Sequence, residues 1–159
     1  MPLEIERRFL IKNDNWKKFI TKKIIIEQGY LSKSMDDWII RIRFTGKDFK
    51  IAIKKHIKSF TSFEFEYSIP RKDGEIIMSN LSNTIKKERF FLEVEKKSWI
   101  IDCFKENNYP LEIAEIELSM EEECLTTLKK TSQKNHPSFI FSLYLSKVFL
   151  FSSDVWSLR

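Results

Sequence analysis

Apolar and polar residues alternate along most of the chain up to residue 119, and this alternation is the period of a half-buried β-strand. In the segment 3–11, Leu3 and Ile5 fall on one face, whereas Glu4 and Glu6 fall on the other. The pattern predicts eight strands, at 3–11, 24–31, 38–44, 49–55, 63–69, 85–95, 98–104 and 111–119.

Helical spacing is confined to short segments. Asn13 or Asp14 can cap a short helix in which Trp16 and Phe19 lie at helical spacing. Residues 73–79 predict a short helix or a turn. The expected fold class is therefore α+β, mainly antiparallel β with a few flanking helices.

The chain after residue 122 is less regular. Ser119 and Glu122 form a capping box, which predicts a helix that follows them. Residues 139–151 are strongly apolar, but the run is too short for a transmembrane helix, which needs about 20 apolar residues. We expect a core domain at 1–122 and a tail at 123–159 that packs on the same domain.

Charged residues on the polar faces are sorted by sign. Acids two residues apart stand on three strands, as Glu4/Glu6, Glu64/Glu66 and Glu115/Glu117, and bases stand on three others, as Arg41/Arg43, Lys50/Lys54 and Lys87/Arg89. If the strands close into a barrel, these faces converge inside it and the apolar faces turn outward. Such an interior would need an ionic ligand, because buried unpaired charges cost several kcal/mol each.

An open sheet is the alternative to the barrel. Antiparallel sheets ordinarily bury one face and solvate the other, so periodicity alone favours an open sheet with a salt-bridged outer face. Aromatic side chains at strand spacing, such as Trp99, are expected in the apolar core in either case. Lys50 is expected in solvent, near the hairpin at Gly46.

Composition limits the partners. The 159 residues suit one domain, and the net charge of +5 favours an anionic partner. Acids interleaved with the bases argue against nucleic acid, since a surface that follows phosphates is basic throughout. Two cysteines without a CxxC pair and two histidines argue against a structural zinc site. No signal peptide and no membrane span are recognised, so the cytoplasm is the expected compartment.

Several motifs together resemble one known family. Glu4-Ile5-Glu6-Arg7-Arg8 resembles the ExExK signature of the CYTH, or triphosphate tunnel metalloenzyme, superfamily. Further strands resemble those of the family in family order: Gln28-Gly29-Tyr30-Leu31, Ile40-Arg41-Ile42-Arg43, Ile51-Ala52-Ile53-Lys54, Glu64-Phe65-Glu66-Tyr67, Ile85-Lys86-Lys87-Glu88-Arg89-Phe90, Trp99-Ile100-Ile101-Asp102 and Ala114-Glu115-Ile116-Glu117-Leu118. The likeness extends from residue 3 to about residue 122.

The resemblance implies an eight-stranded closed tunnel barrel that hydrolyses inorganic triphosphate, or another triphosphate, with Mg²⁺ or Mn²⁺. Carboxylate oxygens suit these hard cations. The metal ligands would come from Glu4, Glu6, Glu64, Glu66, Glu115 and Glu117, with Asp102 as a further acid whose face the alternation does not assign. Arg8, Arg41, Arg43, Lys54, Lys87 and Arg89 would bind the triphosphate. Glu4, Glu6, Arg8, Glu115 and Glu117 are the expected catalytic residues, in a monomer or homodimer.

The chain departs from the family pattern in three places. Arg8 replaces the signature lysine, which keeps the charge but not the compact ammonium group. Ser62 stands where an arginine commonly precedes the acidic pair. The family's Trp-Leu-Gly, Glu-Val-Thr and Tyr-Asn elements are missing from 124–159, which is either a divergent helical lid or the product of an altered reading frame.

These departures leave other functions open. Class IV adenylyl cyclases and thiamine-triphosphatases share the metal and triphosphate ligands, although no adenine-reading motif is evident. A tunnel that binds polyphosphate or a nucleotide without turnover is the alternative from another functional class.

Overall fold

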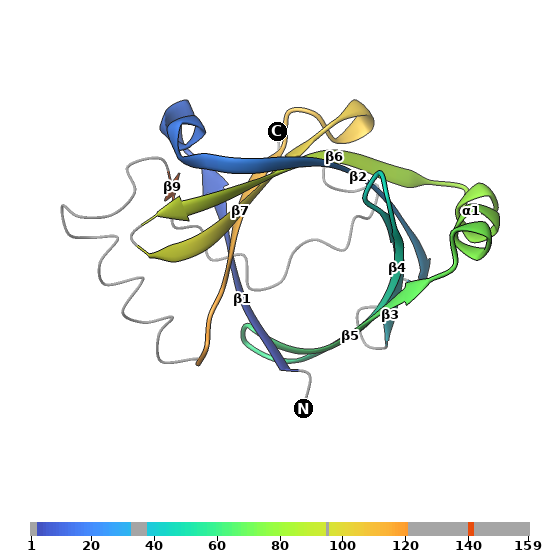
Figure 1. Cartoon of the computed structure of the whole chain (residues 1–159). Coiled ribbons are helices and arrows are strands. Elements are labelled where there is room, and N and C mark those ends of the chain that lie inside the picture. The colour runs from blue at the N-terminus through green and yellow to red at the C-terminus, as the bar shows by residue number, and fades with distance from the viewer. Residues whose placement is uncertain (1–2, 33–37, 95, 121–139, 142–159) are drawn as a thin grey trace.

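Eight antiparallel strands form a closed barrel in the computed structural model, which describes residues 3–32, 38–94, 96–120 and 140–141 (Figure 1). The strands are β1 (Leu3–Ile11), β2 (Ile20–Ser32), β3 (Ile39–Phe44), β4 (Phe49–Lys58), β5 (Thr61–Ile69), β6 (Thr84–Val94), β7 (Lys97–Phe104) and β8 (Glu112–Glu117). Hydrogen-bonded neighbours follow the order β5-β4-β3-β2-β6-β7-β8-β1.

The first strand closes the ring, because β1 pairs with β8 on one side and with β5 on the other. Leu3 of β1 lies opposite Phe63 of β5, and Glu6 lies opposite Glu117 of β8. A two-residue strand, β9 (Ile140–Phe141), adds to the end of β1. The predicted closed barrel is confirmed, and the open sheet with a solvated face is wrong.

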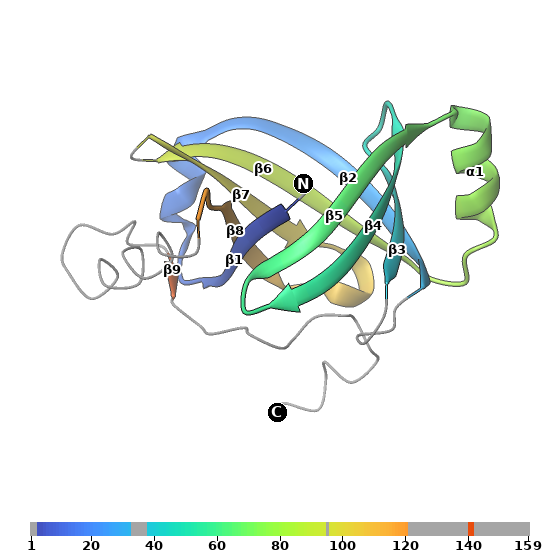
Figure 2. The same ribbon diagram turned by 90° about the horizontal axis from the view of Figure 1, so that it is seen from below.

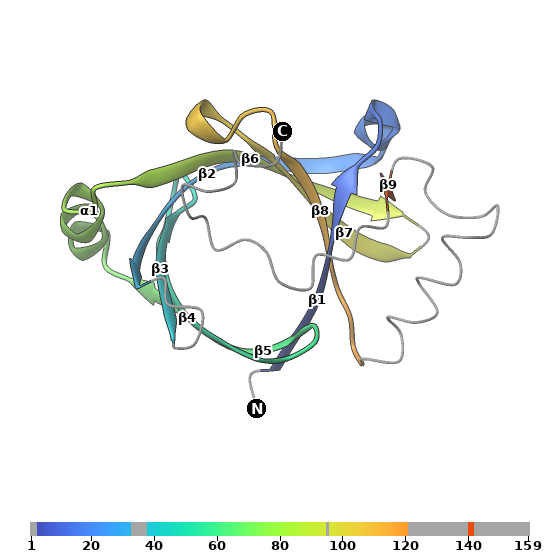
Figure 3. The ribbon, with the colours of Figure 1, turned by 180° about the vertical axis from the view of Figure 1, so that it is seen from behind.

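Helices lie outside the barrel wall (Figures 2 and 3). The helix α1 (Arg71–Ser79) lies beside β3 and β4, where Gly74 meets Phe49 so closely that a Cβ atom would lie 2.2 Å from its ring. The 3₁₀ helix η1 (Asp14–Phe19) begins after Asn13, whose side chain accepts a hydrogen bond from the Asn15 amide. A second 3₁₀ turn, η2 (Glu106–Asn108), precedes β8.

The largest apolar core of the described residues lies on the outer surface of the barrel wall. It joins the outward side chains of β1, β6, β7 and β8 with Trp16 of η1. Trp99 is 3% exposed within this core, as predicted, and Phe9 packs against it with ring centroids 5.7 Å apart. The apolar side chains of this core therefore point outward and the charged ones inward, while a smaller apolar cluster of Ile85, Phe104 and Ile113 lies on the inner face.

Several predicted element boundaries differ in the structure, and β4, for example, continues to Lys58. β2 begins at Ile20 instead of residue 24, because its first residues pair with β6 although Thr21, Lys22 and Lys23 show no alternation. α1 starts at Arg71, directly after Pro70, and β8 spans only Glu112–Glu117. Glu122 of the capping box, and the tail apart from β9, lie outside the described residues.

Candidate functional site

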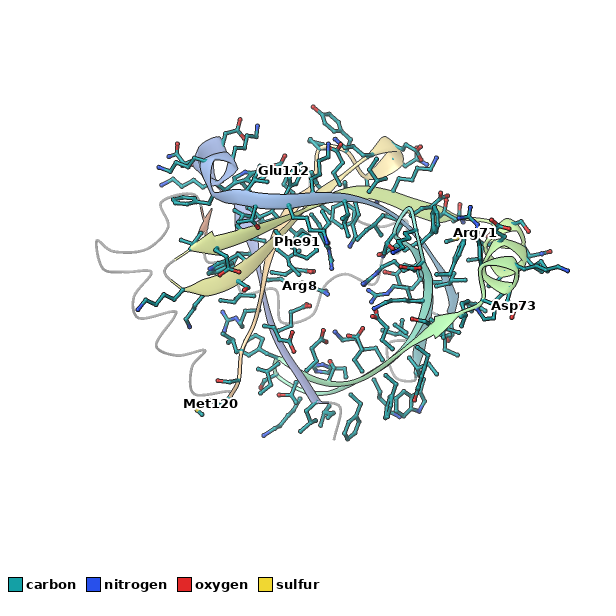
Figure 4. All side chains as sticks on the ribbon, in the orientation of Figure 1. Arg8, Arg71, Asp73, Phe91, Glu112 and Met120 are labelled. Carbon is teal, nitrogen blue, oxygen red and sulfur yellow. The ribbon has the colours of Figure 1, made fainter. Side chains whose placement is uncertain are left out.

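Acidic and basic side chains of the predicted site share the inner face of the barrel (Figure 4). Strand register places there the acids Glu4, Glu6, Glu64, Glu66, Asp102, Glu115 and Glu117 and the bases Arg8, Arg41, Arg43, Lys54, Lys87 and Arg89. Asp102, whose face the sequence left unassigned, belongs to this set because it lies opposite Arg89. Residues far apart in the chain thus meet in one interior.

Arg8 links two acids at the seam between β1 and β8. Its Nε lies 2.6 Å from Oε1 of Glu6 and 3.0 Å from Oε1 of Glu115. Burial alone would lower the pKa of Arg8, but the two carboxylates outweigh it and hold that pKa above its usual value. The arginine that replaces the signature lysine therefore faces the acids of the predicted site.

Lys54 joins β1 to β5 across the closure of the barrel. Its ammonium group forms an ion pair with Glu4 and lies 3.4 Å from Oε2 of Glu64. Arg41 Nη2 approaches Oε1 of the same Glu64 at 3.2 Å. Burial alone would raise the pKa of Glu64, but Lys54 and Arg41 together hold it below its usual value.

Asp102 is completely buried and binds two bases. Arg89 donates to both carboxylate oxygens, from Nε and from Nη2, each at 2.7 Å. Lys87 Nζ lies 2.5 Å from Oδ2. Arg89 Nη2 also reaches Oε2 of Glu115 at 3.2 Å, so this group connects to the acids around Arg8.

Glu66 and Glu117 lie toward more open parts of the interior. Glu66 pairs with Lys50 at 2.6 Å and with Arg43 at 3.5 Å. Lys50 is 41% exposed in its side chain, which agrees with the predicted solvated position near the hairpin, although it is also ion-paired. Glu117, opposite Glu6, is exposed at the end of β8.

Four carboxylates form what we call the acidic cluster: Glu4, Glu6, Glu64 and Glu115. Burial, then repulsion from Glu6, raises the pKa of Glu4 to about 7. Burial and the charge of Glu115 also raise the pKa of Glu6. Burial acts on Glu115 in the same direction, but Arg8 and Arg89 outweigh it and hold its pKa well below the usual range. Negative charge at Glu4 and Glu6 is thus incompletely neutralised.

Three arginines form the arginine cluster: Arg41, Arg43 and Arg89. Burial and the repulsion of Arg41 and Arg89 lower the pKa of Arg43 to about 10. The Nε atoms of Arg41 and Arg43 are buried and have no hydrogen-bond acceptor among the described residues. Burial also lowers the pKa of Lys87 to about 8. Guanidinium groups thus repel one another beside the acidic cluster, and two of their N–H donors lack an acceptor among the described residues.

Sequence reasoning did not select two inner-face residues of β2 for the site. Gln28 lies opposite Arg43, and Tyr30 lies opposite Arg41. Both belong to the alternation of β2 that points inward, and that position was the available signal. A third residue, Arg7, is buried on the outer face, with its guanidinium 4.0 Å from the Phe60 ring centroid.

No three acidic, histidine or cysteine side chains are grouped closely enough to hold a metal ion within the part of the chain that the structure describes. Several of the interior carboxylates are instead turned toward bases, as in the ion pairs of Arg8 and Lys54. Among the same residues, no helix has the length and apolar character needed to cross a membrane.

The closed barrel and its charged interior agree with the known proteins to which the chain is similar. No model of a known protein family matches it. It is 31% identical over 120 residues to the inorganic triphosphatase of Acetivibrio thermocellus, and the match covers 74% of this chain and 76% of that protein.

Solved structures show the same fold. The inorganic triphosphatase NE1496 is 21% identical, with a TM-score of 0.61 over 91% of this chain and 88% of that chain. The putative adenylyl cyclase HpAC1 from Hippeastrum, described as having a dominant triphosphatase activity, is 14% identical, with a TM-score of 0.66 over 89% of this chain and 91% of that chain. With its relative from A. thermocellus, its closed barrel and its charged interior, the chain belongs to the CYTH, or triphosphate tunnel metalloenzyme, family.

Proposed function

We propose that this protein hydrolyses inorganic triphosphate inside the barrel, with Mg²⁺ or Mn²⁺ as the cofactor. The relative from A. thermocellus is named as an inorganic triphosphatase, which supports this substrate. The proposed site consists of the acids and bases predicted from the sequence.

One observation carries the proposal: in the interior a group of close carboxylates adjoins a group of close guanidinium groups. The raised pKa of Glu4, to about 7, reflects burial and repulsion among carboxylates that a cation would relieve. The lowered pKa of Arg43, to about 10, reflects burial and repulsion among guanidinium groups that an anion would relieve. A metal–triphosphate complex supplies the cation and the anion together.

The arginine cluster is suited to the phosphate chain. Arg41 and Arg43 each carry a buried Nε–H without an acceptor among the described residues, and a phosphoryl oxygen could accept from it. Arg89 is held in place by Asp102 and faces Glu115. In this proposal the three guanidinium groups orient the triphosphate and neutralise charge that develops on its oxygens during in-line attack by water.

The acidic cluster fits a divalent cation by donor type. Glu4, Glu6 and Glu115 offer the hard carboxylate oxygens that Mg²⁺ and Mn²⁺ prefer. Glu64, Glu66, Glu117 and Asp102 are further candidates, although Asp102 uses both oxygens on Arg89 and Lys87. A cation held there would neutralise triphosphate oxygens and make water easier to deprotonate. Arg8 and Lys54 would then be released from the carboxylates and could approach the phosphates.

The proposal is tested by phosphate release from tripolyphosphate, ATP and thiamine triphosphate, with Mg²⁺, Mn²⁺ or chelator. We expect metal-dependent release, fastest from tripolyphosphate. Faster phosphate release from thiamine triphosphate than from tripolyphosphate would show that thiamine triphosphate is the substrate instead. Stabilisation by tripolyphosphate without release from any substrate would contradict hydrolysis and indicate a binding protein, while formation of a cyclic nucleotide from ATP would indicate a cyclase.

A further inference from the structure

Arg7 is a buried charged residue that the proposed mechanism does not use. It is 2% exposed and lies on the outer face of β1, opposite Ile116 of the apolar core. A buried guanidinium group is costly to remove from water, whereas an apolar side chain at this position would simply extend the core. Packing alone therefore does not explain an arginine at position 7.

The guanidinium group of Arg7 lies over an aromatic ring in the turn between β4 and β5. Its central carbon is 4.0 Å from the ring centroid of Phe60 and 5.6 Å from that of Phe9. The attraction between a cation and a ring face is stronger when both are removed from water. Phe60 follows Ser59, whose φ of 46° lies in the left-handed region, and its ring packs against the outer core. Arg7 thus attaches this turn to β1.

The turn meets β1 at the point where the strand changes partners. Residues 3–5 pair with β5, and the residues from Glu6 onward pair with β8. At this point the Glu6 amide donates to the Phe60 carbonyl at 3.1 Å, and the Leu118 amide donates to the Ile5 carbonyl at 2.8 Å. With three residue pairs, the β1–β5 pairing is the shortest in the described barrel, so a contact that fixes the turn matters most here.

Two members of the acidic cluster lie on either side of this point. Glu4 is opposite Ser62 of β5, and Glu6 is opposite Glu117 of β8. The position of Glu4 relative to Glu6 therefore depends on how firmly the turn is attached to β1. Residues that orient metal ligands without touching the metal change its affinity by about 10–100-fold when they are replaced.

We propose that Arg7 is a positioning residue, which holds the turn at Phe60 against β1. In this way it fixes the spacing of Glu4 and Glu6 for a divalent cation, although its own side chain lies on the outer face. The inference rests on the proposed function, because it takes these two acids as metal ligands.

Amide hydrogen exchange tests the contact between the turn and β1 directly. In Arg7→Met, which keeps the length of the side chain and removes the charge, the Glu6 amide should exchange about tenfold faster. The Leu118 amide, which donates to β1 from the β8 side, is the internal control and should change little. Val94→Ala, a substitution in the same core on β6, controls for a general loss of stability and should affect both amides alike.

The affinity for Mn²⁺, measured by titration calorimetry without substrate, is the second readout. It should be about tenfold weaker in Arg7→Met, and Val94→Ala should bind Mn²⁺ as the unmodified protein does. Arg7→Lys should restore most of the affinity, because an ammonium group also binds a ring face. Phe60→Leu should behave like Arg7→Met, and the double variant should lose no more than either, since both changes remove the same contact.

Unchanged Mn²⁺ affinity in Arg7→Met would overturn the positioning role and leave an active unmodified protein as a triphosphatase. Weaker Mn²⁺ binding with an unchanged Glu6 amide, or additive losses in the double variant, would overturn the action through Phe60. If Arg7→Met does not fold, Phe60→Leu takes its place in both measurements. An unmodified protein that neither binds Mn²⁺ nor cleaves tripolyphosphate would overturn the proposed function itself, and this inference with it.

Discussion

Arg89 and Asp102 form a bidentate ion pair between neighbouring strands, with both nitrogen–oxygen distances at 2.7 Å. The two residues are register partners on β6 and β7, and Asp102 is completely buried. Lys87 binds the same carboxylate, so one acid holds two bases of the proposed substrate-binding set. Asp102 therefore contributes both to the stability of the barrel wall and to the positions of Arg89 and Lys87 in the interior.

Replacement of Asp102 by asparagine should destabilise the protein strongly. The change keeps the shape of the side chain but leaves Arg89 and Lys87 buried without their counter-charge, and breaking a buried ion pair in this way costs about 3–5 kcal/mol. Urea unfolding monitored by circular dichroism measures the loss. Glu75→Gln is the control, because Glu75 pairs with Arg71 on the solvent side of α1 and exposed pairs contribute little. Equal stability of the two variants would contradict this account.

Replacement of Glu117 by glutamine should abolish metal-dependent turnover and leave the fold intact. Glu117 is exposed at the end of β8, so an amide of the same shape is tolerated there. Glu115→Gln should also lower turnover, by about 100-fold or more if it holds the metal. Glu112→Gln is the matched control, since Glu112 lies on the same strand and contacts Cys103. Near-normal activity of Glu117→Gln would remove that residue from the site.

Replacement of Arg41 by lysine should raise KM for tripolyphosphate about tenfold, because lysine keeps the charge and loses the forked donor geometry. Steady-state kinetics at saturating metal measures the change. Arg71→Lys, on the exposed helix α1, tests whether any arginine of the chain gives the same effect. An unaltered KM in Arg41→Lys would show that Arg41 contacts no phosphate through two donors.

The contribution of Glu4 to stability should fall as pH rises from about 5 to about 7.5. Its pKa is about 7 in the folded protein, against 4.5 for an unperturbed glutamate, so the folded state keeps a proton that the unfolded state has already lost. In this window the folded state binds more protons, and the free energy of unfolding decreases with pH, by at most about 3 kcal/mol.

Glu4→Gln isolates this effect, since glutamine does not titrate. In chelator, the stability of the variant relative to the unmodified protein should increase with pH across the same window. Urea unfolding at several pH values measures the difference. A difference that does not vary with pH would show that Glu4 ionises normally in the folded protein.

Local pattern was sufficient to assign most of the inner face. Charges at i and i+2 on a strand must share a face, so Glu4 with Glu6, and Arg41 with Arg43, could be grouped without the structure. The same rule could not decide whether the charged face contacts solvent or lines a closed interior, because closure depends on pairings between distant segments. The contact of Leu3 with Phe63 decides it, and nothing in either strand alone specifies that contact.

For the same reason, the sequence alone could not predict which side chains pair with one another inside the barrel. Asp102 was expected near the metal, and the structure pairs it with Arg89 and Lys87, which remain candidates for the phosphate. Gln28 and Tyr30 were recognised only as part of a family-like strand, because neither carries the charge that marked the other positions.

The position of β1 between β5 and β8 has a consequence for synthesis. During translation the first strand emerges early, but its partner Glu117 follows more than a hundred residues later. Pairings over such sequence separations form slowly, because the intervening chain must be ordered first. A ribosome-bound chain that ends before β8 would therefore hold Glu6 and Arg8, whose register partners lie on β8, on an unpaired strand edge. We expect such nascent chains to be inactive and prone to aggregation, and to gain phosphate-releasing activity only when the ring can close.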